Sequence, residues 1–306
     1  VNGNFDDAQS GVKKIFTNEE YKVLLDRNGF KLSSANSINW GRLVPQIVYY
    51  FSAYADLLAS NEIKLGEEIN VVVPTGNFGN ILAAYYAMKM GIPVNKLICA
   101  SNANNVLTDF INTGVYDRNR QFYATVSPSM DILISSNLER LLYHISGENT
   151  GKINDWFGKL KTDGKYEISD DVKAQIKELF YAGCCDDVKT KETIHSTYAD
   201  FGYLADTHTS VALNVCDAYI EKTGDTTPVI VASTASPFKF SKAVLSAVED
   251  SVKDYEDEFS TVAALEEISS LEAPEQLAAL KGKEVRFTDV TSKEDMAEVV
   301  FKMLGI

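Results

Sequence analysis

The sequence predicts an α/β protein built on a doubly wound, mostly parallel sheet. Short β-rich runs alternate with longer segments whose apolar residues recur at helical spacing, a pattern typical of a parallel sheet covered by helices. Two polar loops directly follow β-rich runs, and sheets of this kind bind ligands at the carboxyl ends of their strands. The chain has 306 residues, a length that favours about two domains.

The first elements are expected to be a strand end at residues 1–7, a helix at 8–16 and a longer helix at 36–59. The longer helix rests on apolar residues at helical spacing, namely Leu43, Ile47, Tyr50, Tyr54 and Leu57. Residues 69–73 form a β-branched run that indicates a buried parallel strand. A helix at 81–90 is expected to end at Gly91, because glycine is favoured just past helix ends.

The remaining elements continue the alternation. A second strand is expected at 97–100, a third at 228–232 and a last one at 284–287. Helices are predicted for a segment ending at residue 111 and for residues 130–145, 170–181, 191–201, 210–222 and 293–304.

The charge of the chain excludes several kinds of partner. The net charge is −14, which argues against nucleic acid or an acidic membrane surface, since both need local cationic excess. No apolar run reaches the roughly 18 residues that span a bilayer. One acidic stretch is interpreted as a solvated helix face: Glu249, Asp250, Asp254, Glu256, Asp257 and Glu258.

The cysteines and histidines do not have the spacing of a zinc site. The sequence contains Cys99, Cys184, Cys185 and Cys216 without a C-x-x-C pair, and only three histidines. We therefore expect no metal, reduced thiols and a cytoplasmic location.

The loop after the 69–73 run carries Gly76, Asn77, Phe78, Gly79 and Asn80. Glycines let the backbone adopt positive φ and turn successive N–H groups toward one point, and the helix that follows adds its own free N–H groups. The loop lacks the Walker A and the dinucleotide-binding patterns. Its spacing is compatible with a phosphate cradle and also with a tight strand-to-helix turn.

Other polar positions allow two interpretations each. Residues 33–42, with Asn36, Ser37 and Arg42, are either a helix cap with spare polar groups or an anion pocket. Arg140 on its own is expected to be a surface cation. The hydroxyl of Thr234 either caps a helix or binds a ligand, and for His208 a structural role at a helix start is favoured over catalysis.

Six segments in order resemble threonine synthases, which belong to the β-family (fold type II) of pyridoxal-phosphate enzymes: residues 1–9, 34–42, 74–80, 101–105, 130–140 and 233–240. The resemblance implies a fold like that of the tryptophan synthase β-subunit. It also implies that residues 1–33 are a remnant of a smaller α/β subdomain and that 34–306 form the large domain. A monomer or homodimer is expected.

The resemblance also implies roles for individual residues. Gly76, Asn77, Phe78, Gly79 and Asn80 would hold the phosphate of pyridoxal 5'-phosphate, and Thr234 would bond its pyridine nitrogen. Asn36, Ser37 and Arg42 would bind the phosphate of the substrate, O-phospho-homoserine, with Asn137, Arg140 and Lys239 nearby. The reaction implied is elimination of phosphate from Cγ and addition of water at Cβ to give threonine.

One departure from the family pattern concerns the Schiff-base lysine. In threonine synthases this lysine lies in a Phe-Lys-Asp type motif, upstream of the segment that residues 1–9 resemble. No such motif occurs here, and Phe238-Lys239-Phe240 stands in a different place. We therefore expect no catalytic lysine in this chain, which would be inactive alone, and place that lysine upstream of Val1. Alternatives are a dehydratase or cysteine synthase of the same fold type, or a non-catalytic module that binds a phosphorylated ligand.

Overall fold

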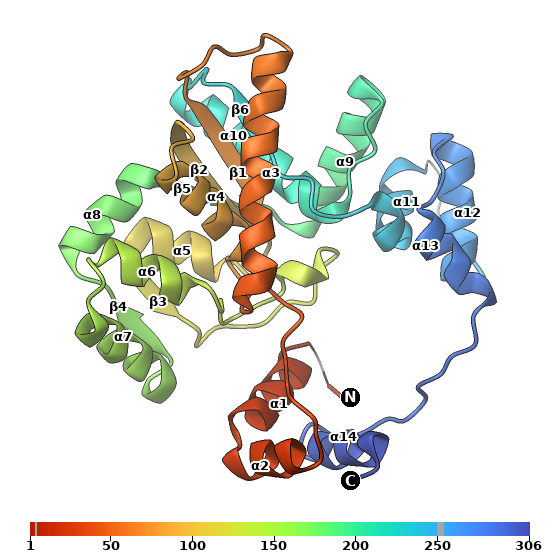
Figure 1. Ribbon diagram of the computed structural model, residues 1–306. Coiled ribbons are helices and arrows are strands. Elements are labelled where there is room, and N and C mark those ends of the chain that lie inside the picture. Colours follow the sequence, from red (N-terminus) through yellow and green to blue (C-terminus); the bar gives the residue numbers. More distant parts are fainter. Residues whose placement is uncertain (4, 250–253) are drawn as a thin grey trace.

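The structure, a computed structural model, describes residues 1–3, 5–249 and 254–306 (Figure 1). Its centre is a sheet of four parallel strands in the order β5-β2-β1-β6. The strands are β1 (Ile69–Pro74), β2 (Val94–Ser101), β5 (Phe180–Cys184) and β6 (Val229–Val231). In register, Val72 of β1 lies between Ile98 of β2 and Val231 of β6. The predicted α/β class with a mostly parallel sheet is confirmed.

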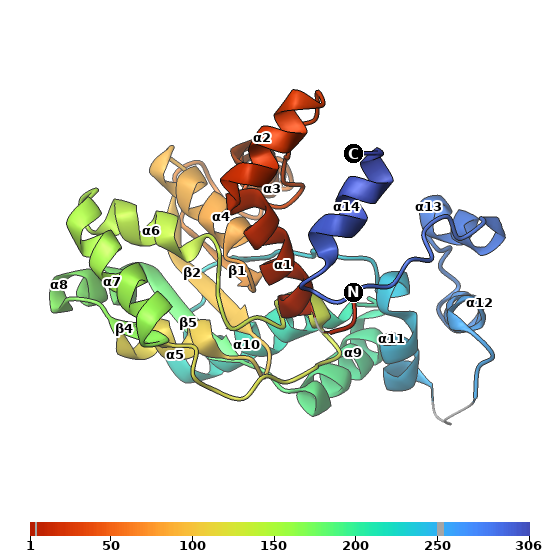
Figure 2. The ribbon, with the colours of Figure 1, turned by 90° about the horizontal axis from the view of Figure 1, so that it is seen from below.

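The two faces of the sheet are covered by different helices, because successive side chains of a strand point to opposite sides. Val71 and Val73 of β1 belong to one core with α3 (Trp40–Ala59) and α4 (Gly79–Lys89). Val72 belongs to a second core, formed with α10 (Thr207–Thr223). Figure 2 shows α3 and α4 on one side of the sheet and α9 (Asp187–Phe201) and α10 on the other.

The first core extends into a helical region with a small second sheet. This sheet pairs β3 (Val115–Asp117) with β4 (Lys165–Glu167) in antiparallel fashion, and the rings of Tyr116 and Tyr166 stack at 5.4 Å between centroids. The helices of this region are α5 (Val106–Thr113), α6 (Leu138–Ile145), α7 (Thr150–Thr162) and α8 (Asp170–Leu179).

A third, smaller core lies beyond β6. It combines Ile194 of α9 with Phe238, Val244 and Leu265. The elements here are η2 (Pro237–Phe240), α11 (Ser241–Val248), α12 (Glu258–Ser269), α13 (Glu275–Ala278) and η3 (Ala279–Gly282).

The two ends of the chain lie side by side (Figure 1). The N-terminal helices α1 (Phe5–Thr17) and α2 (Glu19–Arg27) pack near the C-terminal α14 (Met296–Leu304). The rings of Tyr21 and Phe301 meet edge to face at 5.1 Å, and the backbone N–H of Asn2 donates to the carbonyl of Thr291 at 2.8 Å.

Several expected elements differ in the structure. The strand end at 1–7 is wrong because α1 begins at Phe5, while Asn4 lies outside the described residues. The helix expected at 170–181 ends at Leu179, and residues 180–184 are β5. Phe180 and Ala182 point into the first core, so pairing with β2 and burial outweigh the helical spacing.

Three further expectations are wrong. Of residues 130–145 only α6 is α-helical, since η1 (Pro128–Met130) is a single 3₁₀ turn. Residues 284–287 are exposed and form no strand, because no strand lies beside them to pair with. The acidic stretch is not a helix face: Glu249, Asp254, Glu256 and Asp257 precede α12, which Asp257 caps, and Asp250 lies outside the described residues.

None of the helices in residues 1–3, 5–249 and 254–306 combines the length and apolar character that crossing a bilayer requires.

Candidate functional site

The loop between β1 and α4 presents a row of free backbone donors. Phe78 adopts the left-handed conformation (φ 61°) directly before α4, and its ring is buried against Phe180 at 6.0 Å. The N–H groups of residues 76–81 donate no hydrogen bond within the described part of the chain. Free N–H groups at a helix start are a ready site for an anion.

Two glycines let other segments approach this loop closely. A Cβ added to Gly76 would lie 2.8 Å from the carbonyl oxygen of Ser129. A Cβ added to Gly79 would lie 2.5 Å from the Cβ of Ser37. Any larger residue would push these neighbours away, so the glycines fix the shape of the loop.

Residues before α6 hold the loop by its carbonyl oxygens. The side-chain amide of Asn137 donates to the carbonyl of Asn77 at 2.9 Å, and the hydroxyl of Ser135 donates to the carbonyl of Gly76 at 2.9 Å. With the carbonyls engaged on this side, the N–H groups of the loop stay available to a ligand.

The segment before α3 contains both a helix cap and a cation, the two features that the sequence suggested for it. Asn39 is the N-cap of α3, accepting from the N–H of Gly41 at 2.9 Å, and Asn36 accepts from the N–H of Ile38 at 2.9 Å. The guanidinium of Arg42 donates to the carbonyl of Ala35. The segment is thus a helix cap, and it also supplies Arg42 as a cation.

Arg140 is not a free surface cation. Its guanidinium donates to the carbonyls of Ser37 at 3.0 Å and Ile38 at 2.6 Å, and to the side chain of Asn137 at 2.8 Å. It therefore fastens the segment before α3 to α6 and to the residue that holds the loop.

One pocket of about 380 Å³ collects these segments. Nine of its lining residues were predicted from the sequence: Ser37, Arg42, Gly76, Asn77, Phe78, Gly79, Asn80, Thr234 and Lys239. Asn36, Asn137 and Arg140 do not line it and act as supports. Two more lining residues, Pro74 and Thr75, belong to the segment 74–80 that resembles threonine synthases. The structure adds lining residues that were not predicted to bind a ligand: Gln46, Val73, Ile81, Ser129, Met130, His208 and Ala235.

Two of the added residues have clear contacts. Gln46 donates to the hydroxyl of Ser37 at 2.8 Å, and the ring nitrogen Nε2 of His208 accepts from the N–H of Ser129 at 3.2 Å. Gln46 lies four residues after Arg42, so helical spacing could have indicated it. The predicted place of His208, at a helix start, is that of the structure, since α10 begins at Thr207.

The segment that carries Ser129 is fixed by a buried polar cluster. Asn102 donates to Asp131 at 2.7 Å, and the other carboxylate oxygen of Asp131 accepts from the N–H of Thr125 at 2.9 Å. The described residues contain no group of three or more His, Cys, Asp or Glu suited to hold a metal ion.

Comparisons with known proteins agree on one family. A family model described as the C-terminal part of threonine synthase matches residues 209–300. Human threonine synthase-like 1 is 45% identical over 251 residues, which are 81% of this chain and 33% of that protein. The threonine synthase of Saccharomyces cerevisiae is 38% identical over 262 residues, 81% of this chain and 49% of that protein.

Solved structures agree with the sequences. A structure described as PLP-bound threonine synthase from Brucella melitensis aligns with a TM-score of 0.77 at 35% identity, covering 98% of this chain and 57% of that chain. The yeast threonine synthase aligns with a TM-score of 0.79 at 32% identity, covering 99% of this chain and 58% of that chain. In sequence and fold the chain is of the threonine synthase type.

The threonine synthase resemblance seen in the sequence is thereby confirmed. The chain spans from a third to about half of the length of the curated relatives described above.

Proposed function

We propose that this chain carries the phosphate-binding part of a pyridoxal-phosphate-dependent threonine synthase. The enzyme would convert O-phospho-homoserine and water into threonine and phosphate by γ-elimination and β-addition. The observation that supports this most is that one pocket joins a row of free backbone N–H groups to Arg42, Thr234 and Lys239. The fold and sequence of threonine synthases support it as well.

The loop fits the phosphate of pyridoxal 5'-phosphate. The N–H groups of residues 76–81 have no acceptor in the described part of the chain, and the positive end of α4 adds to their attraction for an anion. No Cβ at Gly76 or Gly79 intrudes. When bound, pyridoxal phosphate supplies an electron sink for carbanions formed on the amino-acid substrate.

Thr234 is the proposed partner of the pyridine nitrogen. It lies just beyond β6, at the carboxyl edge of the sheet, and it lines the same pocket as the loop. A neutral hydroxyl does not force full protonation of the nitrogen, as a carboxylate would, and so tunes the electron sink.

Arg42 and Ser37 are the proposed contacts of the substrate phosphate. A guanidinium forms strong, charge-assisted hydrogen bonds with phosphate, and Ser37 lies against Gly79 and receives a hydrogen bond from Gln46. Lys239 adds a second cation to the pocket. Two local cations suit a phosphorylated substrate better than the neutral-side-chain substrate of a dehydratase, despite a net charge of −14.

We propose that Lys239 does not form the covalent link to the cofactor, and that the chain alone is inactive. Among the described residues that line the pocket, Lys239 is the one lysine. Its ammonium lies 5.3 Å from the ring centroid of Phe240. Borohydride treatment in the presence of pyridoxal phosphate is expected to leave this chain unlabelled. A pyridoxyl adduct found on Lys239 by mass spectrometry would overturn this part of the proposal.

The wider setting is also a proposal. We place the protein in the cytoplasm, as a monomer or homodimer without nucleic-acid partners, with residues 1–33 as part of a smaller subdomain and 34–306 as the large domain. The thiols Cys99, Cys184, Cys185 and Cys216 are all free, which suits a reducing compartment.

The test is binding. Pyridoxal phosphate binding is measured by absorbance and fluorescence, and O-phospho-homoserine binding by calorimetry on the loaded chain. Arg42→Ala is expected to weaken O-phospho-homoserine binding about tenfold through the lost charged hydrogen bond. Arg118→Ala, which is outside the pocket, should change it less than about twofold. If the wild-type chain bound neither pyridoxal phosphate nor inorganic phosphate, the proposal would fail.

A further inference from the structure

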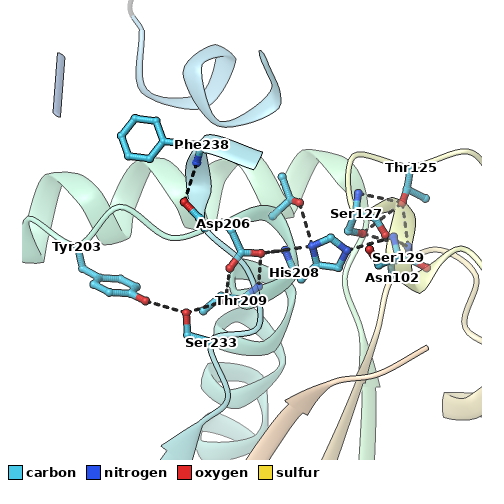
Figure 3. A network of polar contacts seen from close by, with 12 residues as sticks. Asn102, Thr125, Ser127, Ser129, Tyr203, Asp206, His208, Thr209, Ser233 and Phe238 are labelled. Carbon is cyan, nitrogen blue, oxygen red and sulfur yellow. Dashed lines mark hydrogen bonds and ion pairs between the residues drawn. The ribbon is translucent and has the colours of Figure 1, made fainter. Parts of the chain in front are cut away.

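Asp206, the N-cap of α10, makes more contacts than a helix cap needs (Figure 3). Its carboxylate accepts from the N–H of His208 at 2.8 Å and of Thr209 at 3.3 Å, and its second oxygen accepts from the hydroxyl of Thr209. The residue is buried. Burial works to raise the pKa of Asp206, but the hydrogen bonds from His208 and Thr209 outweigh it and lower that pKa. A charged carboxylate is therefore held inside the protein.

Two chains of contacts, here called arms, start at this carboxylate. The first arm leads to the loop of residues 76–80 between β1 and α4, here called the phosphate loop. The ring nitrogen Nδ1 of His208 lies 3.3 Å from Oδ1 of Asp206, and its Nε2 accepts from the N–H of Ser129 at 3.2 Å. Because Nε2 accepts, the ring proton of the neutral imidazole is on Nδ1, facing the carboxylate. The carbonyl of Ser129 is the atom closest to where a Cβ of Gly76 would lie, at 2.8 Å. Asp206 is thus connected to Gly76 by a chain of contacts through His208 and Ser129.

The second arm leads to the residue before Thr234. The hydroxyl of Thr209, whose proton goes to Asp206, lies 3.4 Å from the hydroxyl of Ser233 and can accept from it. Ser233 also contacts the hydroxyl of Tyr203 at 3.2 Å (Figure 3). Ser233 directly precedes Thr234 and follows β6. The two oxygens of one buried carboxylate are therefore connected to two walls of the pocket. One wall is the phosphate loop with Ser129, and the other is the segment of residues 233–235 that carries Thr234.

We propose that Asp206 is a positioning residue that sets the spacing between the phosphate loop and Thr234. The inference rests on the proposed function, because that spacing matters for a ligand that contacts both walls. A site is effective when its first contacts are held by residues that are themselves locked by hydrogen bonds, and Asp206 locks two of them at once. His208 then acts as the link to Ser129.

The alternative is that Asp206 merely caps α10, and the chain offers a matched control. Asp186 is the N-cap of α9, accepts from the N–H of Lys189 at 2.9 Å, is exposed and does not line the pocket. Serine caps helices about as well as aspartate but has a single oxygen. Asp206→Ser therefore keeps the cap but removes the negative charge that faces His208 and the second oxygen that accepts from Thr209, so both arms are lost. Asp186→Ser changes a cap alone.

The experiment compares Asp206→Ser with Asp186→Ser by two measurements. Hydrogen exchange reports the protection of the Ser129 amide and of residues 233–235, and fluorescence titration gives the Kd of pyridoxal phosphate. We expect Asp206→Ser to accelerate exchange at both walls and to raise the Kd about tenfold. Asp186→Ser should keep both the exchange rates and the Kd within about twofold of the wild-type values. Pyridoxal phosphate binding that is equal in the two variants, with Ser129 equally protected, would overturn the inference.

A second pair of variants covers the case in which Asp206→Ser does not fold. His208→Gln keeps an acceptor that can reach the Ser129 N–H, whereas His208→Leu does not. Weaker pyridoxal phosphate binding and faster Ser129 exchange in His208→Leu than in His208→Gln support the inference, and equal values overturn it. If the wild-type chain bound no pyridoxal phosphate, the proposed function would fail, while Ser129 exchange would still decide the role of Asp206.

Discussion

The side-chain amide of Asn137 donates a 2.9 Å hydrogen bond to the backbone carbonyl of Asn77, across 60 positions of sequence. Asn137 is fully buried, so the contact has no water to replace it. Asn137→Ala is expected to destabilise the fold by about 1–3 kcal/mol and to weaken pyridoxal phosphate binding, because the loop loses its anchor. Urea unfolding and fluorescence titration measure the two effects.

The control for this variant is another asparagine with a capping role. Asn149 caps α7, accepting from the N–H of Lys152 at 2.9 Å, and does not line the pocket. Asn149→Ala should cost about 1 kcal/mol of stability without changing the Kd. If both variants changed the Kd equally, the anchoring role of Asn137 would be wrong.

Gly76→Ala is expected to impair binding through backbone contact. The new Cβ would lie 2.8 Å from the carbonyl of Ser129, so the loop or the 3₁₀ turn η1 must move. Gly158, within α7, has no neighbour within 4 Å of an added Cβ. Gly158→Ala should therefore stabilise the chain by up to about 1 kcal/mol, while Gly76→Ala destabilises it and weakens binding of inorganic phosphate. Thermal unfolding with and without phosphate distinguishes them.

Parts of the fold and site with local causes could be predicted from sequence. Four of the five residues of the run 69–73 are β-branched, and a loop with Gly76 and Gly79 comes shortly after it, so the strand and loop were evident. Helical spacing likewise located α3 and α10. The strand β5 was missed, because residues 180–184 directly follow α8 without a glycine or proline between, and only pairing with β2 makes them extended.

The rest of the site depends on contacts between distant segments. Ser129 lines the pocket because His208, 79 positions away, accepts from its N–H. Arg140 was expected to be a surface cation, but its partners are carbonyls 102 and 103 positions away. Hydrogen bonds of this kind have no periodicity in the sequence. The same limit explains residues 284–287, whose strand-forming side chains have no neighbouring strand.

The stability of the sheet is expected to depend on pH through Asp225. Its carboxylate accepts from the side-chain amides of Asn70 at 2.9 Å and Asn95 at 3.2 Å. Hydrogen bonds from Thr227 and Tyr219 lower the pKa of Asp225 well below its usual range. A lowered folded-state pKa contributes stability above the unfolded value of about 4, and this contribution is lost as the pH falls through the folded pKa.

Asp225→Asn should therefore lower the free energy of unfolding by about 1 kcal/mol at pH 7. The value is modest because the carboxylate is only half-buried and solvent screens it. The difference from wild type should shrink below about pH 4. Urea unfolding from pH 3 to 7 measures it, with the exposed Asp200→Asn of α9 as control. A difference that does not vary with pH would contradict the assignment.

The four thiols are expected to react in a fixed order. Burial raises the pKa of all four thiols, to about 12 for Cys99 and to about 11 for Cys185 and Cys216, and of the four only Cys184 is exposed to a reagent. At pH 8 iodoacetamide should modify Cys184 first and the others only on unfolding, since the thiolate is the reactive form. Peptide mass spectrometry identifies the sites, and Cys184→Ser should abolish the early product. Early modification of Cys99 would show that β2 opens in the native state.

The C-terminal helix α14, which packs beside α1, is held in two ways, by its covalent connection and by non-covalent contacts. A covalent tether reaches it through residues 283–290, which are exposed, while Tyr21 and the Lys293–Asp7 ion pair of 3.0 Å bind it without that tether. A protease that cuts the tether would therefore nick the chain without dissociating it. The nicked molecule would behave as a two-fragment complex, and the strength of α14 docking could be measured as a dissociation constant.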